Sequence, residues 1–223
     1  SLILTESRSY WLASLTFLLL FSLMSFRSNK RLILTSAFIL LTAGAVISQV
    51  PVLKDRFHSI TDTKNNGSNI TRLMIWKSHI KAFTEDYTLT ERIFGAGDNA
   101  SKLAWRHFGR AFQEVTGKEE IPPPGELRKW FHGGETHNLY LKFLTKYGIL
   151  GLLGYLFFWI YVIYRNLERR DSLFIKAFVA GYVGFLVASF FENNFTDAEV
   201  QFTLFFILGV NFALISETAV RQR

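Results

Sequence analysis

A chain of 223 residues has the length of one or two soluble domains, but its composition argues against a soluble protein. Apolar residues make up 49% of the chain and charged residues 19%, whereas an average soluble domain carries about 25% charged residues. The formal net charge of +7 does not by itself indicate nucleic-acid binding, because its meaning depends on where the basic residues lie.

Five nearly uncharged blocks hold most of the apolar residues. Each block is close to the roughly 20 residues that a helix needs to cross a bilayer. The sequence therefore predicts an all-α polytopic membrane protein with five transmembrane helices, at Ser9–Phe26, Leu32–Val50, Tyr147–Tyr164, Leu173–Phe191 and Val200–Ser216. The first block has no small-x-small cleavage site, and the chain starts at Ser1 without an initiator methionine. We therefore expect a part of a longer protein rather than a signal peptide.

Basic residues between and after these blocks indicate the orientation in the membrane. Segments 27–31 and 165–172 and the C-terminal tail are basic, while segment 192–199 contains neither Lys nor Arg. The positive-inside rule places the basic side in the cytoplasm, and long loops cross the membrane regardless of their charge. We expect two transmembrane helices in 1–50, an extracytoplasmic loop domain in 51–138, three transmembrane helices in 139–216 and a cytoplasmic tail in 217–223.

The extracytoplasmic loop is too long to be structureless, so we expect it to fold as a small helical cap. The chain contains no cysteine, and the cap therefore forms without disulfide bonds. An N-cap at Ser68 or Asn69 begins a helix whose apolar stripe includes Met74, Trp76 and Ile80. After it we expect a glycine turn at 91–98, a second helix at Lys102–Val115, an extended segment at 122–125 and a helix from Leu139 to Tyr164.

Three motifs on the expected outer face carry a resemblance to a known family. They are Glu6-Ser7-Arg8-Ser9 before the first span, Thr71-Arg72 and Trp76 followed by Phe94-Gly95-Ala-Gly97, and Glu135-Thr-His137-Asn138 leading into a helix with Gly148, Gly151 and Gly154. In this order they resemble the signature of the O-antigen ligase and polymerase superfamily of bacterial envelope proteins. The resemblance covers nearly the whole chain, which would correspond to the C-terminal half of the family fold.

The resemblance implies a metal-independent, inverting glycosyltransferase without a cofactor. Such an enzyme lies in the bacterial inner (cytoplasmic) membrane, with its large loop on the periplasmic face, and transfers glycan from undecaprenyl pyrophosphate to an acceptor hydroxyl. The expected reaction is O-antigen ligation to the lipid A core in lipopolysaccharide biosynthesis, and polymerisation of O-antigen or exopolysaccharide is the alternative. The expected partners are the carrier-linked glycan donor, the lipid A core or another glycan acceptor, and the bilayer, but no nucleic acid.

By the same resemblance, Arg72 and Arg8 bind the pyrophosphate of the donor. The departing lipid pyrophosphate is negatively charged, and catalysis needs cations where that charge develops. Arginine suits this role because its planar fork stays protonated and binds phosphate oxygens bidentately. The alternatives are that Arg8 anchors the chain at lipid headgroups, and that Arg72 is solvated or forms a cation–π contact with Trp76.

His137 is the expected catalytic residue. A neutral imidazole can take up the proton of the attacking hydroxyl, and the helix that follows His137 disfavours the charged imidazolium. Glu135 is a rival base, Asn138 would orient His137 or the substrate, and Trp76 completes the supporting residues. The alternatives are that His137 caps the helix or lies at the membrane interface, and that Glu135 is a carboxylate at a helix start.

A transporter and a passive membrane scaffold are the alternatives from other functional classes. Transporters place ionisable residues near the bilayer midplane, whereas the five expected spans contain only Lys176, near a cytoplasmic end. A metal site is not expected, because the remaining histidines at 58, 79, 107 and 132 form no close ligand pair.

Overall fold

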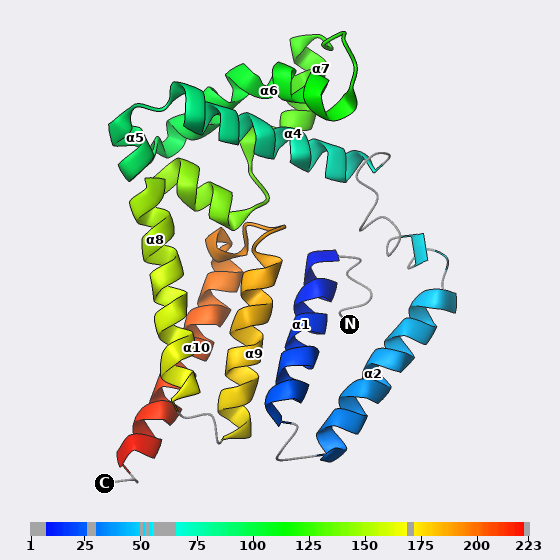
Figure 1. Cartoon of the computed structure of the whole chain (residues 1–223), viewed down its shortest axis with the longest axis vertical. Coiled ribbons are helices and arrows are strands. Elements are labelled where there is room, and N and C mark those ends of the chain that lie inside the picture. Colours follow the sequence, from blue (N-terminus) through cyan, green and yellow to red (C-terminus); the bar gives the residue numbers. More distant parts are fainter. Residues whose placement is uncertain are drawn as a thin grey trace. The chain divides into compact units, whose positions relative to one another are not determined.

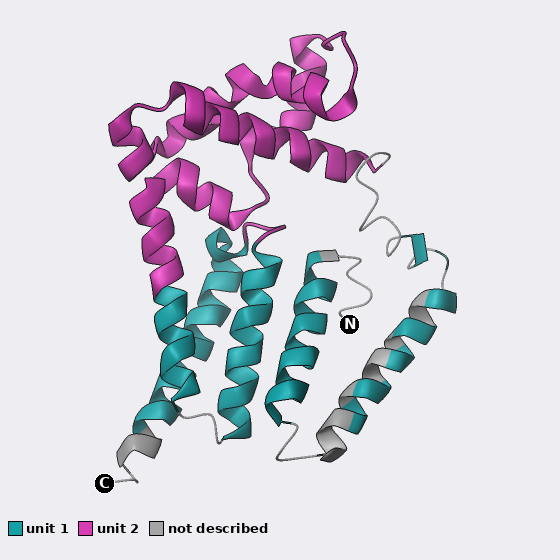
Figure 2. Cartoon of the chain, viewed as in Figure 1, with its two compact units in different colours: residues 1–57, 158–189, 194–223 teal, residues 58–157, 190–193 magenta. Residues whose placement is uncertain are grey.

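The computed structural model describes residues 8–25, 30–49, 51, 54–55, 66–168 and 172–220 (Figure 1). Helices dominate these residues and no strand occurs among them, so the prediction of an all-helical fold is confirmed. The chain divides into two compact units (Figure 2). Unit 1 comprises Ser1–Phe57, Phe158–Ser189 and Asn194–Arg223, and unit 2 comprises His58–Phe157 and Phe190–Asn193.

Two helices among the described residues are long and apolar enough to cross a membrane. They are Leu139–Leu167 and the segment Ala198–Ser216. Two shorter apolar helices occur at Ser9–Ser25 and Leu173–Ala188. The number of membrane spans in the chain, predicted as five, therefore stays a prediction.

Unit 1 is built from helices α1 (Arg8–Ser25), α2 (Lys30–Gln49), α9 (Leu173–Ala188), α10 (Ala198–Val220) and the last turns of α8 (Leu139–Leu167). Helices α1 and α9 pack side by side (Figure 1). Gly184 of α9 permits this packing, because a Cβ atom at that position would lie 2.8 Å from the carbonyl oxygen of Ala13. Small residues commonly bring the backbones of apolar helices together in this way.

A buried polar cluster joins three helices of unit 1. The amides of Asn166 in α8 and Asn211 in α10 exchange hydrogen bonds of 2.9 and 2.7 Å. The hydroxyl of Tyr182 in α9 donates to the side-chain oxygen of Asn211 over 3.1 Å. Hydrogen bonds of this kind fix the register of apolar helices, which otherwise have little to distinguish one alignment from another.

Unit 2 is organised around a packed pair of helices, α4 (Gly67–Lys81) and α6 (Ala100–Thr116), which run in opposite directions (Figure 1). Its core consists of Met74, Ile75, Ala82, Tyr87, Ala104, Phe108, Phe112, Leu127 and Phe131. Ion pairs lie along the seam: Glu114 accepts from Lys81 at 2.8 Å and from Lys77 at 3.2 Å, and these lysines lower its pKa. Arg110 likewise contacts Glu85 at 3.1 Å.

The predicted helices of unit 2 are present, with corrections to their details. The helix expected at Lys102–Val115 is confirmed as α6. The N-cap of α4 is Asn66, whose side chain accepts from the amide of Asn69, rather than Ser68 or Asn69 itself. Ile80, expected on the buried stripe, is half exposed, because the buried residues of α4 are Met74, Ile75, Ser78 and His79.

Two short helices were not expected from the sequence. Helix α5 (Leu89–Phe94) occupies part of the expected glycine turn and starts with a capping box between Thr88 and Glu91. Helix α7 (Pro124–Phe131) begins inside the segment expected to be extended. Proline is tolerated in the first turn of a helix, where the missing N–H would have no partner in any case.

Helix α8 is broken at Gly148, which has φ 73° and ψ −173° (Figure 1). The break separates a first segment at 139–147 from a second at 149–167. The chain on either side of Gly95 lies directly against the break, and the amide of Ala96 donates to the carbonyl of Thr145 over 3.0 Å. A Cβ atom on Gly95 would lie 2.2 Å from the carbonyl oxygen of Lys146.

Candidate functional site

The site lies in unit 2 and is organised by one face of α4. Arg72, Trp76 and His79 are four and three residues apart, a spacing that places them on the same side of a helix. All three bind chain segments that are distant in sequence: Arg72 binds the segment 190–193, and Trp76 and His79 bind the loop that carries His137.

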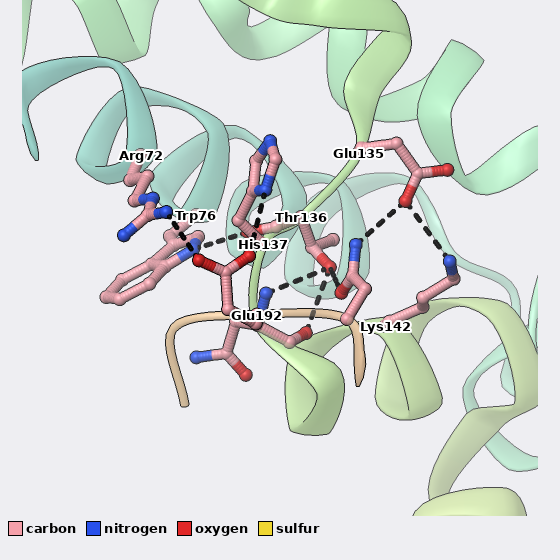
Figure 3. A network of polar contacts seen from close by, with 9 residues as sticks. Arg72, Trp76, Glu135, Thr136, His137, Lys142 and Glu192 are labelled. Carbon is pink, nitrogen blue, oxygen red and sulfur yellow. Dashed lines mark hydrogen bonds and ion pairs between the residues drawn. The ribbon is translucent and has the colours of Figure 1, made fainter. Parts of the chain in front are cut away.

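Glu192 lies between Arg72 and His137 (Figure 3). One carboxylate oxygen accepts from the guanidinium of Arg72 at 3.1 Å, and the other lies 3.9 Å from Nδ1 of His137. The second distance is too long for a hydrogen bond, so the contact with His137 is electrostatic. The three side chains are between 20% and 38% exposed, which leaves the cluster accessible to a ligand.

His137 has an unusual backbone conformation. Its φ of 45° lies in the left-handed region, and among the described residues His132 is the other non-glycine residue with positive φ. Such conformations cost of order 1–3 kcal/mol and tend to occur where a side chain is held for function. The residue after it, Asn138, caps α8 by accepting from the amide of Leu141 at 2.9 Å. The helix cap is therefore Asn138 rather than His137.

Two side chains of α4 hold the loop before His137. The indole N–H of Trp76 donates to the carbonyl of Thr136 over 2.6 Å. His79 is 2% exposed, and its burial lowers its pKa to about 4, so the ring is neutral at ordinary pH. Its Nε2 therefore donates to the carbonyl of Gly134 over 2.9 Å. The indole N–H of Trp76 thus binds the loop before His137, whereas the guanidinium of Arg72 binds Glu192.

Glu135 has partners of its own, apart from the Arg72–Glu192–His137 cluster (Figure 3). Its Oε2 accepts from Lys142 at 3.1 Å and from the amide of Asn193 at 2.8 Å. Asn193 in turn lies 3.2 Å from the hydroxyl of Thr136. Glu135 therefore ties the segment 190–193 to the start of α8.

A pocket of about 990 Å³ contains both Arg72 and His137 in its wall. The N-terminal half of α4 forms one side, and the end of α6 and the end of α7 form the other. The two residues expected to bind pyrophosphate and to act as base thus face one cavity of unit 2. Its volume is at the upper end of the range for small-molecule sites.

The remaining expectations concern Arg8 and a metal. Arg8 is the first residue of α1 in unit 1, and its side chain lies outside the described residues. Glu192 was not expected as a site residue. It is the first residue of the segment 192–199, which is expected on the same outer face as the three motifs. Across the described ranges, no group of three or more His, Cys, Asp or Glu side chains is arranged to hold a metal ion.

The described residues are all-helical, include apolar helices of membrane-spanning length, and hold an Arg–Glu–His cluster whose arginine and histidine line a pocket, which are the features of a membrane-embedded enzyme. The comparison with known families identifies which one: the chain belongs to the O-antigen ligase family, whose model matches residues 1–156. The resemblance inferred from the motifs is thereby confirmed. The family consists of glycosyltransferase-like enzymes of the cell envelope. Comparisons with curated proteins and with solved structures return no match.

Proposed function

We propose that the protein is a metal-independent glycosyltransferase that moves glycan from undecaprenyl pyrophosphate to an acceptor hydroxyl, with the lipid A core as the acceptor. The observation that carries the proposal is the convergence of Arg72 and His137 on one pocket, with Glu192 between them. A cation for the leaving pyrophosphate and a base for the attacking hydroxyl are the two groups that this reaction requires.

In the proposed reaction, His137 takes the proton of the acceptor hydroxyl through Nε2, because Nδ1 faces Glu192. The acceptor oxygen forms its bond to the anomeric carbon as the bond from that carbon to the pyrophosphate breaks. The electron pair of the broken bond stays on the pyrophosphate, where Arg72 and, in our proposal, Arg8 stabilise the charge. Attack opposite the leaving group inverts the anomeric centre.

Glu192 has two roles in this proposal. Its carboxylate stabilises the imidazolium that forms when His137 accepts the proton, as carboxylates do beside catalytic histidines. It also holds the guanidinium of Arg72 at the pocket wall until the pyrophosphate arrives. Arginine has five N–H donors, so Arg72 can bind the carboxylate and phosphate oxygens at the same time.

The membrane arrangement belongs to the same proposal. Residues 1–50 and 139–216 would supply five transmembrane helices in the inner membrane, and residues 51–138 the periplasmic loop domain. The break at Gly148 supports this view, since the segment 149–167 alone has the length that a bilayer requires. The segment 139–147 would then belong to the periplasmic part.

The test expresses the protein in bacteria that lack their own O-antigen ligase and follows the carrier-linked glycan by electrophoresis. Glycan on the lipid A core is the expected result. Lengthened glycan that stays on the carrier would instead identify a polymerase. If neither pool changes, the proposed transfer is refuted.

Two variants test the roles proposed for His137 and Arg72. His137→Asn should abolish transfer, and it is preferable to alanine because asparagine tolerates the left-handed backbone of this position. Arg72→Lys should also lose activity, because an ammonium group cannot replace the bidentate fork. Arg106→Lys is the matched control, since Arg106 is exposed and lies outside the pocket. Wild-type transfer in His137→Asn would remove His137 from the reaction.

A further inference from the structure

The segment 100–131 forms the far wall of the pocket that contains Arg72 and His137. This segment supplies Phe112 and Thr116 near the end of α6, Lys118 just after it, and Trp130 near the end of α7. The wall is positioned by the turn at Gly117, whose φ of 70° ends α6. This segment therefore contributes directly to the space next to the proposed reacting groups.

Trp130 offers a fixed aromatic surface in this wall. Its ring stacks on that of Phe112, with centroids 5.5 Å apart and planes 24° from parallel. Phe112 is 1% exposed and belongs to the core of unit 2, whereas Trp130 is 37% exposed. The indole is thus held in place from below and remains partly open to solvent. Its open face therefore offers a flat apolar surface to a ligand in the pocket.

Polar groups line the same pocket as this aromatic surface. The hydroxyl of Thr116 donates to the carbonyl of Phe112 over 2.8 Å and accepts from the amide of Lys118 over 3.3 Å, so one lone pair of its oxygen can still accept from a ligand. Thr71 and Lys118 add a hydroxyl and a cation to the pocket wall. A pocket that combines an aromatic face with hydrogen-bonding groups matches a sugar, which has an apolar C–H face and polar hydroxyls at its edge.

We propose that this wall, made of Phe112, Thr116, Lys118 and Trp130, is a saccharide subsite that holds the acceptor glycan with one sugar ring against Trp130. The inference rests on the proposed function. We assign the subsite to the acceptor because His137, the base that must touch the acceptor hydroxyl, lines the same pocket. Arg72 lines it too, so the kinetic experiment below separates acceptor from donor. The segment 100–131 thereby selects which glycan the enzyme extends.

A binding experiment tests the subsite independently of turnover. The probe is the core oligosaccharide released by mild acid from lipopolysaccharide of the ligase-deficient host, titrated calorimetrically into the whole protein in detergent. Trp130→Ala should weaken binding about tenfold, the factor that corresponds to about 1.4 kcal/mol. Trp130→Phe should retain most of the affinity, because the aromatic face remains. Lys129→Ala, on the same helix but outside the pocket, should bind like the wild type.

A kinetic experiment then identifies which substrate the subsite holds. Initial rates are measured with lipopolysaccharide lacking O-antigen and with carrier-linked glycan, each varied in turn. Trp130→Ala should raise the KM for the lipopolysaccharide and leave kcat and the KM for the donor unchanged, as expected when ground-state and transition-state binding are lost equally. A rise in the KM for the donor alone would overturn the assignment to the acceptor.

The outcomes separate the two proposals. If the wild type transfers glycan, and Trp130→Ala transfers it equally well and binds the oligosaccharide with equal affinity, the subsite is overturned and the proposed function stands. Oligosaccharide binding that depends on Trp130 without any transfer supports the subsite and refutes the proposed function. Absence of oligosaccharide binding to the wild-type protein also overturns the subsite.

Discussion

Replacing Gly148 by alanine should disrupt the joint between α5 and α8. The backbone of Gly148 has φ 73° and ψ −173°, a region that is essentially restricted to glycine and costs other residues about 1–3 kcal/mol. The new Cβ atom would also lie 2.3 Å from the carbonyl oxygen of Ile93 and 2.5 Å from the amide nitrogen of Gly95. Both neighbours are backbone atoms, so a side-chain rotation cannot relieve the overlap.

The overlap forces the chain around Gly95 away from α8. That movement breaks the hydrogen bond from Ala96 to Thr145, which contributes about 0.5–1.5 kcal/mol. Together with the backbone strain, Gly148→Ala should destabilise unit 2 by about 3 kcal/mol. For a chain of this size, that loss corresponds to a decrease in Tm of roughly 6–12 °C.

The assay is thermal unfolding of the detergent-solubilised protein, followed by the loss of its monomeric peak after heating. Gly154→Ala is the matched control: Gly154 lies on the same helix, and no heavy atom lies within 4 Å of its Cβ position. Alanine there should leave Tm unchanged or raise it slightly, because glycine is a poor helix former. If the two variants unfold at the same temperature, the reasoning about the joint is wrong.

Three other perturbations follow from the site and its surroundings. His79 has a folded pKa of about 4 against 6.5 for the free side chain, so the unfolded state binds a proton that the folded state excludes. Stability should therefore be retained above pH 6.5 and fall by about 3 kcal/mol as the pH decreases toward 4. His79→Gln, which keeps a donor for Gly134, should abolish this component of the pH dependence in denaturant titrations, and an unchanged profile would contradict the assignment. Glu192→Gln should slow transfer roughly fivefold, because a partly exposed charge 3.9 Å from His137 contributes no more than about 1 kcal/mol. An undiminished rate constant in single-turnover assays would exclude Glu192 from catalysis. Thr88→Ala removes the capping box of α5 and should cost about 1 kcal/mol in the same thermal assay, whereas Thr90→Ala, on the exposed side of that helix, should have little effect.

The sequence predicted those helices of unit 2 whose apolar residues recur with a clear helical period. Helix α6 buries Ala104, Phe108 and Phe112 at intervals of four residues, and its predicted bounds lie within two residues of those observed. The short helices α5 and α7 lack enough turns to show a period. Their signals were local instead: the capping box at Thr88 preceded α5, and Pro124 marked the first turn of α7.

The candidate site could be predicted only where it follows motifs. Arg72 and His137 were expected from the resemblance, and the structure places both in the wall of one pocket. Glu192 was missed because it is 120 residues from Arg72, and no local pattern indicates a partner at that separation. The role of Trp130 was equally hidden, since the support beneath it, Phe112, comes from another helix.

The position of Glu192 in the chain also determines when the cluster can form during synthesis. Ribosomes add about 5–20 residues per second, so Arg72 and His137 are made several seconds before the carboxylate that pairs with them. Until the segment 190–193 joins unit 2, the pocket wall contains the arginine and the histidine without this carboxylate. In the nascent protein the site is therefore completed only after α9 has been made, which ties its assembly to the synthesis of the C-terminal helices.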